Sequence, residues 1–123
     1  MEKLIDTPGQ SFYFSSIENL VNNSDSKKKC AVILTGEDLP IFYENAFHLI
    51  GECINQIIVI DENVNGLYQK IKDLSNVFII SASSIKDATR IALNSASLSK
   101  NVIYISSNTS QHSTTDLLNL IEK

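Results

Sequence analysis

The 123-residue sequence has little of what several specialised classes of protein depend on. Its two cysteines, Cys30 and Cys53, stand far apart without a CxxC pair, so neither a disulfide framework nor a zinc site is indicated. Arginine occurs once, as Arg90, and the net charge is −4. Because phosphate neutralisation needs clustered positive charge, this balance argues against a nucleic-acid partner. The one basic run, three lysines at 27–29, is interpreted as a solvated loop.

Long apolar segments are also missing. No run approaches the roughly 20 residues that a membrane-spanning helix needs, and the first residues lack the apolar segment of a signal peptide. We therefore expect a cytoplasmic protein with two reduced, buried thiols and no membrane partner. The length predicts one domain, residues 1–123, which can bury a hydrophobic core without disulfides or metals.

What the sequence does contain is a regular alternation of strand-like and helix-like segments. Apolar runs rich in β-branched residues alternate with segments of helical spacing from residue 30 onward. Such an order is typical of right-handed parallel βαβ units, so we predict an α/β fold. More specifically, we predict a Rossmann-like three-layer sandwich with a mostly parallel sheet and helices on both faces. The predicted strands are 3–5, 30–35, 56–60, 76–80 and 101–105, and the predicted helices are 15–22, 40–53, 66–74, 84–98 and 115–123.

Capping residues support several of these helix starts. Ser15 and Glu18 fit a capping box, Pro40 suits a first helical turn, and Ser84 with Asp87 resembles another cap. The first strand is expected to join one side of the sheet. The apolar pattern predicts a core that includes Val32, Leu34, Ile58, Ile60, Val77, Ile79, Ile91, Val102 and Ile105.

Polar residues gather where the predicted strands end. In open α/β sheets, ligands bind outside the carboxyl ends of the strands, so these residues are candidates for facing a ligand. No GxGxxG and no GxxxxGK[ST] motif occurs, so the sequence predicts no nucleotide cofactor. No metal site is predicted either. The candidate ligand-facing residues are Asp6, Thr7, Ser11, Thr35, Gly36, Asp38, Ser81, Ser106, Ser107 and Asn108.

Two groups of these polar residues have two interpretations each. Glu37 and Asp38 could act as an acid/base pair or as Mg²⁺ ligands, or they could complement the dipole of the following helix. The serine-rich segments 81–84 and 106–110 could hold an anion through hydroxyl and N–H groups, or they could cap helices. We favour the dipole and the capping interpretations.

Neither histidine is assigned a catalytic role. His48 falls within a predicted helix beside core positions, which favours a structural role. His112 lies among serines, but no group that would orient it as a base can be identified from the sequence. No catalytic residue is therefore predicted.

Taken in order, these segments resemble the C-terminal domain of the Mur ligases, closest to those that add D-glutamate to UDP-N-acetylmuramoyl-alanine in bacterial peptidoglycan synthesis. The likeness covers nearly the whole chain and is carried by "LIDTPGQSFYFSSIENL", "CAVILTGEDLPIFYENA", "SIKDATRIALNSA" and "VIYISSNTS". It implies a domain that presents an amino-acid substrate. In a full-length parent it implies ATP-dependent ligation of D-glutamate.

The residues that contact ligands in that family are largely replaced here. The resemblance implies that residues 6–10 match a loop that meets the nucleotide and the central domain, with Gly9 and Phe12 at its Lys and Asn positions. Leu39 stands where the family has the Lys of an Asp-Lys-Gly turn, after a retained Asp38. Replacing Lys by Leu removes a charge that would meet a substrate carboxylate.

Two functions remain open. The resemblance implies that the P-loop and the Mg²⁺ ligands belong to the family's central domain, so we expect no ligation by these residues alone. The alternative is a free-standing Rossmann-like binding or interaction module without a role in peptidoglycan synthesis.

The aromatic residues Phe12 and Tyr13 are candidates for an interface. At least one of them is expected at the surface, where it would contact a second copy, a Mur-type central domain or another protein. The alternative is that both fold over the edge of the sheet and close it.

Overall fold

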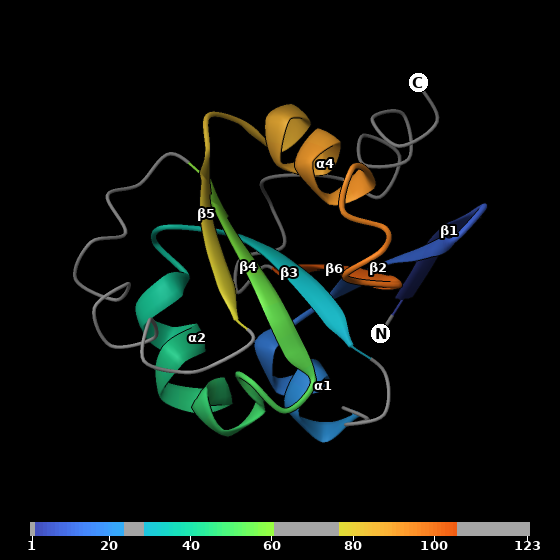
Figure 1. Cartoon of the computed structure of the whole chain (residues 1–123). Coiled ribbons are helices and arrows are strands. Elements are labelled where there is room, and N and C mark those ends of the chain that lie inside the picture. The colour runs from blue at the N-terminus through green and yellow to red at the C-terminus, as the bar shows by residue number, and fades with distance from the viewer. Residues whose placement is uncertain (1, 24–28, 61–76, 106–123) are drawn as a thin grey trace.

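Figure 1 shows the computed structural model of the protein, which describes residues 2–23, 29–60 and 77–105. The predicted helices 66–74 and 115–123 lie outside the described residues. The described elements are β1 (Glu2–Thr7), β2 (Gln10–Ser15), α1 (Ile17–Asn22), β3 (Cys30–Thr35), α2 (Leu39–Ala46), the 3₁₀ helix η1 (Phe47–Leu49), β4 (Ile54–Ile60), β5 (Phe78–Ala82), α4 (Ile85–Leu93) and β6 (Asn101–Ile105).

The six strands form one sheet in the order β1-β2-β6-β3-β4-β5. Each neighbouring pair from β2 to β5 is parallel, and β1 alone runs antiparallel to its neighbour. The prediction of an α/β fold with a mostly parallel sheet is therefore confirmed, as are the four parallel strands after residue 29. The predicted first strand does lie at one side of the sheet.

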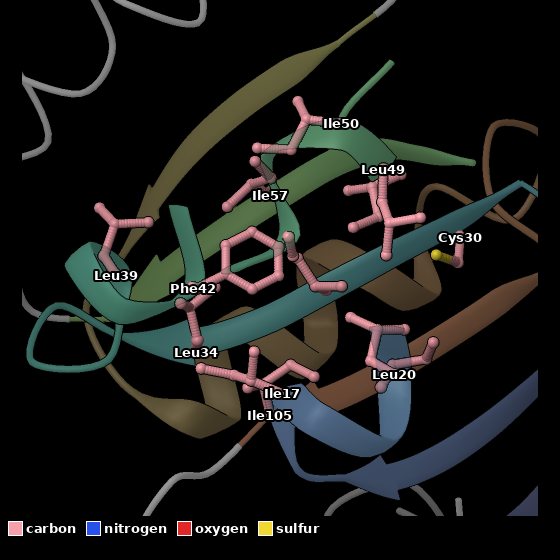
Figure 2. Close-up of a cluster of buried hydrophobic side chains, with 14 of the residues drawn as sticks. Ile17, Leu20, Cys30, Leu34, Leu39, Phe42, Leu49, Ile50, Ile57 and Ile105 are labelled. Atoms are coloured by element: carbon pink, nitrogen blue, oxygen red, sulfur yellow. The ribbon is translucent and has the colours of Figure 1, made fainter. Parts of the chain in front are cut away.

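Helices cover both faces of the sheet. Side chains from α1 and α2 join one buried cluster with alternate residues of β3, β4 and β6. Figure 2 shows Phe42 of α2 in the middle of that cluster, with Leu34 and Ile57 from the sheet around it. On the opposite face, Ala88 and Ala92 of α4 pack against the other residues of the same strands. In Figure 1, α4 accordingly lies on one side of the sheet, and α1 and α2 lie on the other.

The predicted core is largely correct. Two groups of residues differ in how fully they are covered. The residues of the inner strands are buried. Those in or next to β5 and at the rim of α4 are half-buried. Strand β5 is the last strand of the sheet and pairs with β4 on one side. The buried residues are Val32, Leu34, Ile58, Ile60, Val102 and Ile105, and the half-buried residues are Val77, Ile79 and Ile91.

The N-terminal segment differs from its prediction. Residues 6–10 are not a loop that leads into a helix, because they form the turn of a β-hairpin in which Thr7 pairs with Gln10. Pro8 followed by Gly9 at φ +94° is the residue pair that type II turns favour. Residues 12–14 then lie in β2, and β2 pairs in parallel with β6. Alternating directions along the strand place these three aromatic side chains on both faces of the sheet.

Three helix boundaries also differ from the prediction. The helix predicted over 84–98 is α4, which ends at Leu93. The N-cap of α1 is Ser16 rather than Ser15, and its Oγ accepts a hydrogen bond from the N–H of Asn19 at 3.1 Å. The helix predicted over 40–53 ends at Ala46 and continues as η1, and Gly51 then adopts φ +95°. A glycine in the left-handed conformation ends a helix. The helical segment therefore stops before Gly51, and β4 begins at Ile54, two residues earlier than predicted.

None of the helices in the described ranges combines the length and the apolar character needed to span a bilayer.

The central strands should dominate stability. Ile58 is fully buried in β4 under α4, so Ile58→Ala should lower the free energy of unfolding by roughly 2–5 kcal/mol through lost contacts and a cavity. Ile41→Ala is the control, because Ile41 of α2 is 47% exposed and its loss should cost no more than about 0.5 kcal/mol. Urea unfolding followed by circular dichroism measures both. A loss below about 0.5 kcal/mol for Ile58→Ala would show that the described core is wrong.

Candidate functional site

The carboxyl ends of the parallel strands form one polar edge of the sheet. The five strands β2, β3, β4, β5 and β6 run in the same direction, so the turns that follow them lie at this edge. Its described parts are Ser16 between β2 and α1, the turn 35–38 between β3 and α2, and the turn 83–84 between β5 and α4. Ser81 is exposed on β5, one residue before that strand ends. The candidates Ser106, Ser107 and Asn108 lie outside the described residues.

The turn between β3 and α2 holds an internal carboxylate–hydroxyl pair. The Oγ1 of Thr35 lies 3.4 Å from Oδ2 of Asp38, and the Asp38 N–H donates to the Thr35 carbonyl at 3.1 Å. Asp38 is the N-cap residue of α2 and is 8% exposed, whereas Glu37 is exposed. A carboxylate at this position complements the positive end of the helix dipole. The arrangement supports the dipole interpretation of Asp38 over a paired acid and base.

The residue after Asp38 belongs to the core. Leu39 is buried in the cluster with Phe42, and Pro40 occupies the first turn of α2 as predicted. A proline at this position loses no helical hydrogen bond, because the first N–H groups of a helix have no partner within it. The turn therefore directs an apolar side chain inward at the position where the Mur pattern has a lysine.

The turn between β5 and α4 is closed by a reciprocal cap. The Oγ of Ser84 accepts a hydrogen bond from the Asp87 N–H at 3.1 Å, and Oδ2 of Asp87 accepts one from the Ser83 N–H at 3.0 Å. The hydroxyl of Ser83 also lies 3.3 Å from the same oxygen. These N–H groups already have protein acceptors, so the capping interpretation of this serine segment is the one supported.

Arg90 brings a cation to this edge, which the sequence analysis did not anticipate. Its Nη2 lies 2.6 Å from Oδ1 of Asp87, one helical turn away. The hydrogen bond from the Ser83 backbone and the Arg90 guanidinium together lower the pKa of the Asp87 carboxyl from its ordinary value. The three-residue spacing of Asp87 and Arg90 on a helix was the signal that could have revealed the pair.

Three of the predicted ligand-facing residues lie at the opposite edge. Asp6, Thr7 and Ser11 surround the hairpin turn, and Ser11 pairs with Asn101 at the start of β6. Because β1 is antiparallel, its carboxyl end meets the amino ends of the parallel strands, and the structure does not bring these residues to Thr35 or Ser84. They interact with each other instead. The Ser11 hydroxyl donates to Asp6 at 2.6 Å, and Lys3 lies 2.8 Å from the same carboxylate.

This exposed cluster of Lys3, Asp6 and Ser11 fixes the hairpin rather than a ligand. Hydrogen bonds from Lys3 and then from Ser11 lower the pKa of the Asp6 carboxyl. The ion pair with Asp6 raises the pKa of the Lys3 ammonium in turn.

The aromatic interface prediction is wrong for Phe12. Its side chain is 0% exposed and stacks on Tyr104 with ring centroids 6.4 Å apart. Tyr13 is half-buried against the other face of the sheet. The alternative, in which both side chains fold over the edge of the sheet and close it, is not found either. Phe12 and Tyr13 lie in β2, between β1 and β6, and their side chains point to opposite faces of the sheet.

The two cysteines form no disulfide and lie buried next to each other at the amino edge. The Cys30 N–H donates to the Cys53 carbonyl at 2.8 Å. The neighbouring Cys53 thiol and burial raise the pKa of the Cys30 thiol far above its ordinary value. A thiol held in its protonated form is a poor nucleophile, so Cys30 is expected to be unreactive, and both side chains belong to the buried cluster.

Within residues 2–23, 29–60 and 77–105, no group of three or more His, Cys, Asp or Glu side chains is placed to hold a metal ion. His48 is exposed in η1, not set beside core positions as predicted. His112 lies outside the described residues.

A surface groove between α1 and α2 is a feature that sequence reasoning missed. It has a volume of about 430 Å³ and is lined by Ser16, Ile17, Glu18, Val21, Asn22, Ile41 and Asn45. Its lining combines the apolar side chains of Ile17, Val21 and Ile41 with polar residues. The position of Ile41, off the buried stripe of α2, was the available signal.

These features define the class of fold, which is an α/β domain with a six-stranded, mostly parallel sheet and polar turns along one edge. No protein-family model and no curated protein matches the sequence.

The Asp87 carboxylate should make stability depend on acid. Its folded pKa is lowered, so its contribution is full above the ordinary carboxyl pKa and is lost as pH falls through the lowered value. Asp87→Asn should therefore lower the urea midpoint at pH 7, and the difference from the wild type should shrink towards pH 2. Glu44→Gln, a charge-matched change at an exposed position of α2, is the control and should leave the midpoint nearly unchanged at both pH values. An Asp87→Asn effect that is independent of pH would contradict the described cap.

Proposed function

We propose that the chain is a non-catalytic binding module similar to the C-terminal domain of the Mur ligases. In this proposal it is a cytoplasmic, Rossmann-like three-layer sandwich whose carboxyl edge presents an amino-acid substrate. It does so to a central domain that carries the ATP chemistry. The chain alone performs no ligation.

The observation that carries the proposal is where the segments of the resemblance fall in the fold. The segment "CAVILTGEDLPIFYENA" forms β3, the turn with Asp38 and α2, which is the strand, turn and helix order of the family. The later segments form α4 and β6 in the same order as in the family pattern. Strand β2, the serine pair 15–16 and α1 supply an order of strand, polar turn and short helix. That order begins after the hairpin formed by residues 6–10. The hairpin itself lies at the amino edge and not at the carboxyl edge.

The electrostatics of the edge favour an amino-acid ligand over a polyphosphate. Glu37 and Asp38 follow β3, and the guanidinium of Arg90 is already paired with Asp87. Acidic side chains repel a triphosphate and reduce its rate of encounter. An amino acid brings an ammonium group that can donate hydrogen bonds to the exposed Glu37 carboxylate, and Thr35 and Ser83 carry hydroxyl groups at the same edge.

The second candidate is an interaction module without a role in peptidoglycan synthesis. The groove between α1 and α2 is the specific observation that favours it, because its lining combines apolar and polar side chains as contact surfaces do. In this case the carboxyl edge binds neither amino acid nor nucleotide.

Titration of the ¹⁵N-labelled chain separates the two candidates. With D-glutamate, we expect saturable amide shifts confined to residues 35–38 and 83–84, with an affinity of about millimolar strength. L-Glutamate is the matched control ligand and should shift these amides less. Thr35→Val should weaken the D-glutamate shifts without unfolding the chain. ATP should give no saturable shift, and no phosphate should be released with UDP-N-acetylmuramoyl-alanine and D-glutamate.

The absence of any D-glutamate shift would reject the first candidate in favour of the second. Micromolar ATP affinity or phosphate release by the pure chain would contradict both.

A further inference from the structure

The two outermost strands of the sheet, β1 and β5, differ in how they are protected against pairing with another chain. Edge strands present unpaired N–H and C=O groups, and proteins usually blunt them with charges, prolines or bulges. Strand β1 has all three, since Lys3 and Asp6 lie on it, its register shifts between Lys3 and Ile5, and Pro8 follows it. Strand β1 is therefore a guarded edge.

Strand β5 at the other edge has none of these devices. In the sheet order, β5 is the last strand, and β4 is the strand with which it pairs among the described residues. Its five residues, Phe78 to Ala82, include no charge and no proline, and the flanking residues 77 and 83–85 are also uncharged. The pairing with β4 runs without a bulge. Figure 1 shows β5 along the side of the sheet opposite β1.

Strand β5 also exposes the most accessible large apolar side chain among the described residues. Phe78 is 53% exposed, and Ile79 and Ile80 are half-buried. Ile80 and Ala82 belong to the face covered by α4, whereas Val77 and Ile79 belong to the face covered by α2. Since side chains alternate along a strand, Phe78 points to the same face as Ile80.

We propose that β5 is a self-association edge, at which two copies of the chain pair β5 with β5 in antiparallel fashion about a twofold axis. Centred on Ile80, this register places Phe78 of each copy opposite Ala82 of the other, and Ile79 opposite Ser81. In each of these two pairs a large side chain meets a small one. At the twofold axis, Ile80 of one copy meets Ile80 of the other. The inference is independent of the ligand proposed above.

Two features of the chain select a second copy as the occupant. Both copies carry a net charge of −4, but residues 77–85 hold no charge, so no like charges face each other when β5 pairs with β5. An antiparallel pair about a twofold axis is closed, because it consumes both β5 edges and, among the described strands, leaves the guarded β1 edges at its ends. The result is a dimer with one continuous sheet, not a fibre.

Sedimentation equilibrium of the full chain over a wide range of concentrations tests the proposal. The wild type should change from the 13.6 kDa monomer towards twice that mass as concentration rises. Phe78→Lys and Ser81→Lys place a charge at the edge, and each should raise the dissociation constant by at least about tenfold. Both positions are exposed, so the monomer should remain folded by circular dichroism. If Phe78→Lys unfolds the chain, Ser81→Lys gives the answer.

Phe47→Lys is the matched control. Phe47 is 44% exposed and belongs to η1, not to β5, so the same change of residue should leave the association constant unaltered. A wild type that stays monomeric at every concentration would overturn the proposal. So would a dimer that survives both β5 variants, or one that dissociates with Phe47→Lys.

Discussion

Burial of β3 on both of its faces is the constraint on which the rest of the structure depends. Residues 31–34 of this strand are almost inaccessible to solvent, and β4 and β6 flank it on either side. A strand in this position needs apolar cover above and below the sheet, which α4 supplies on one face, and α1 and α2 on the other. Because both faces of the sheet belong to the core, the polar groups of the sheet gather at the amino and carboxyl ends of the strands, where the turns begin. The positions of the candidate functional residues therefore follow from how the sheet is packed.

The two edges use their polar groups differently. At the amino edge, the buried amide of Gln10 donates to the carbonyls of Ala92 and Ser99 at 2.7 and 3.1 Å, and Gln56 contacts Ser95. These bonds join the end of α4 to β2 and β4, and they leave no buried side-chain polar atom of the described residues without a partner. At the carboxyl edge, the hydroxyl and carboxylate groups lie in short turns that cap helices. The amino edge thus joins α4 to the sheet, and the carboxyl edge is the one to which the proposed ligand site is assigned.

The parts of the fold that were clearest in the sequence are the strands with two-sided burial. A strand covered on both faces is a continuous apolar run, so β3, β4 and β6 were recognisable from "CAVILT", "QIIVI" and "NVIYI" alone. Strand β2 was not, because three consecutive aromatics fit a helix start as well as a strand, and local sequence does not say which partner a strand will take. The same limit misplaced Asp6, Thr7 and Ser11, since the direction of an edge strand is set by its hairpin. At the site, the acidic turn and the Ser84 cap were predictable from short-range spacing, whereas the groove between α1 and α2 depends on how two helices pack.

Residue-resolved amide hydrogen exchange on the native protein tests the dependence on β3 most directly. If burial of both faces holds the structure together, the amides of residues 31–34 should exchange only through global unfolding, and those of β1 should exchange through smaller local openings. The free energy of exchange in β3 should then equal the free energy of unfolding from urea denaturation. Exchange in β3 that is as fast as in β1 would contradict the account, because it would mean that the centre of the sheet opens without the rest of the fold.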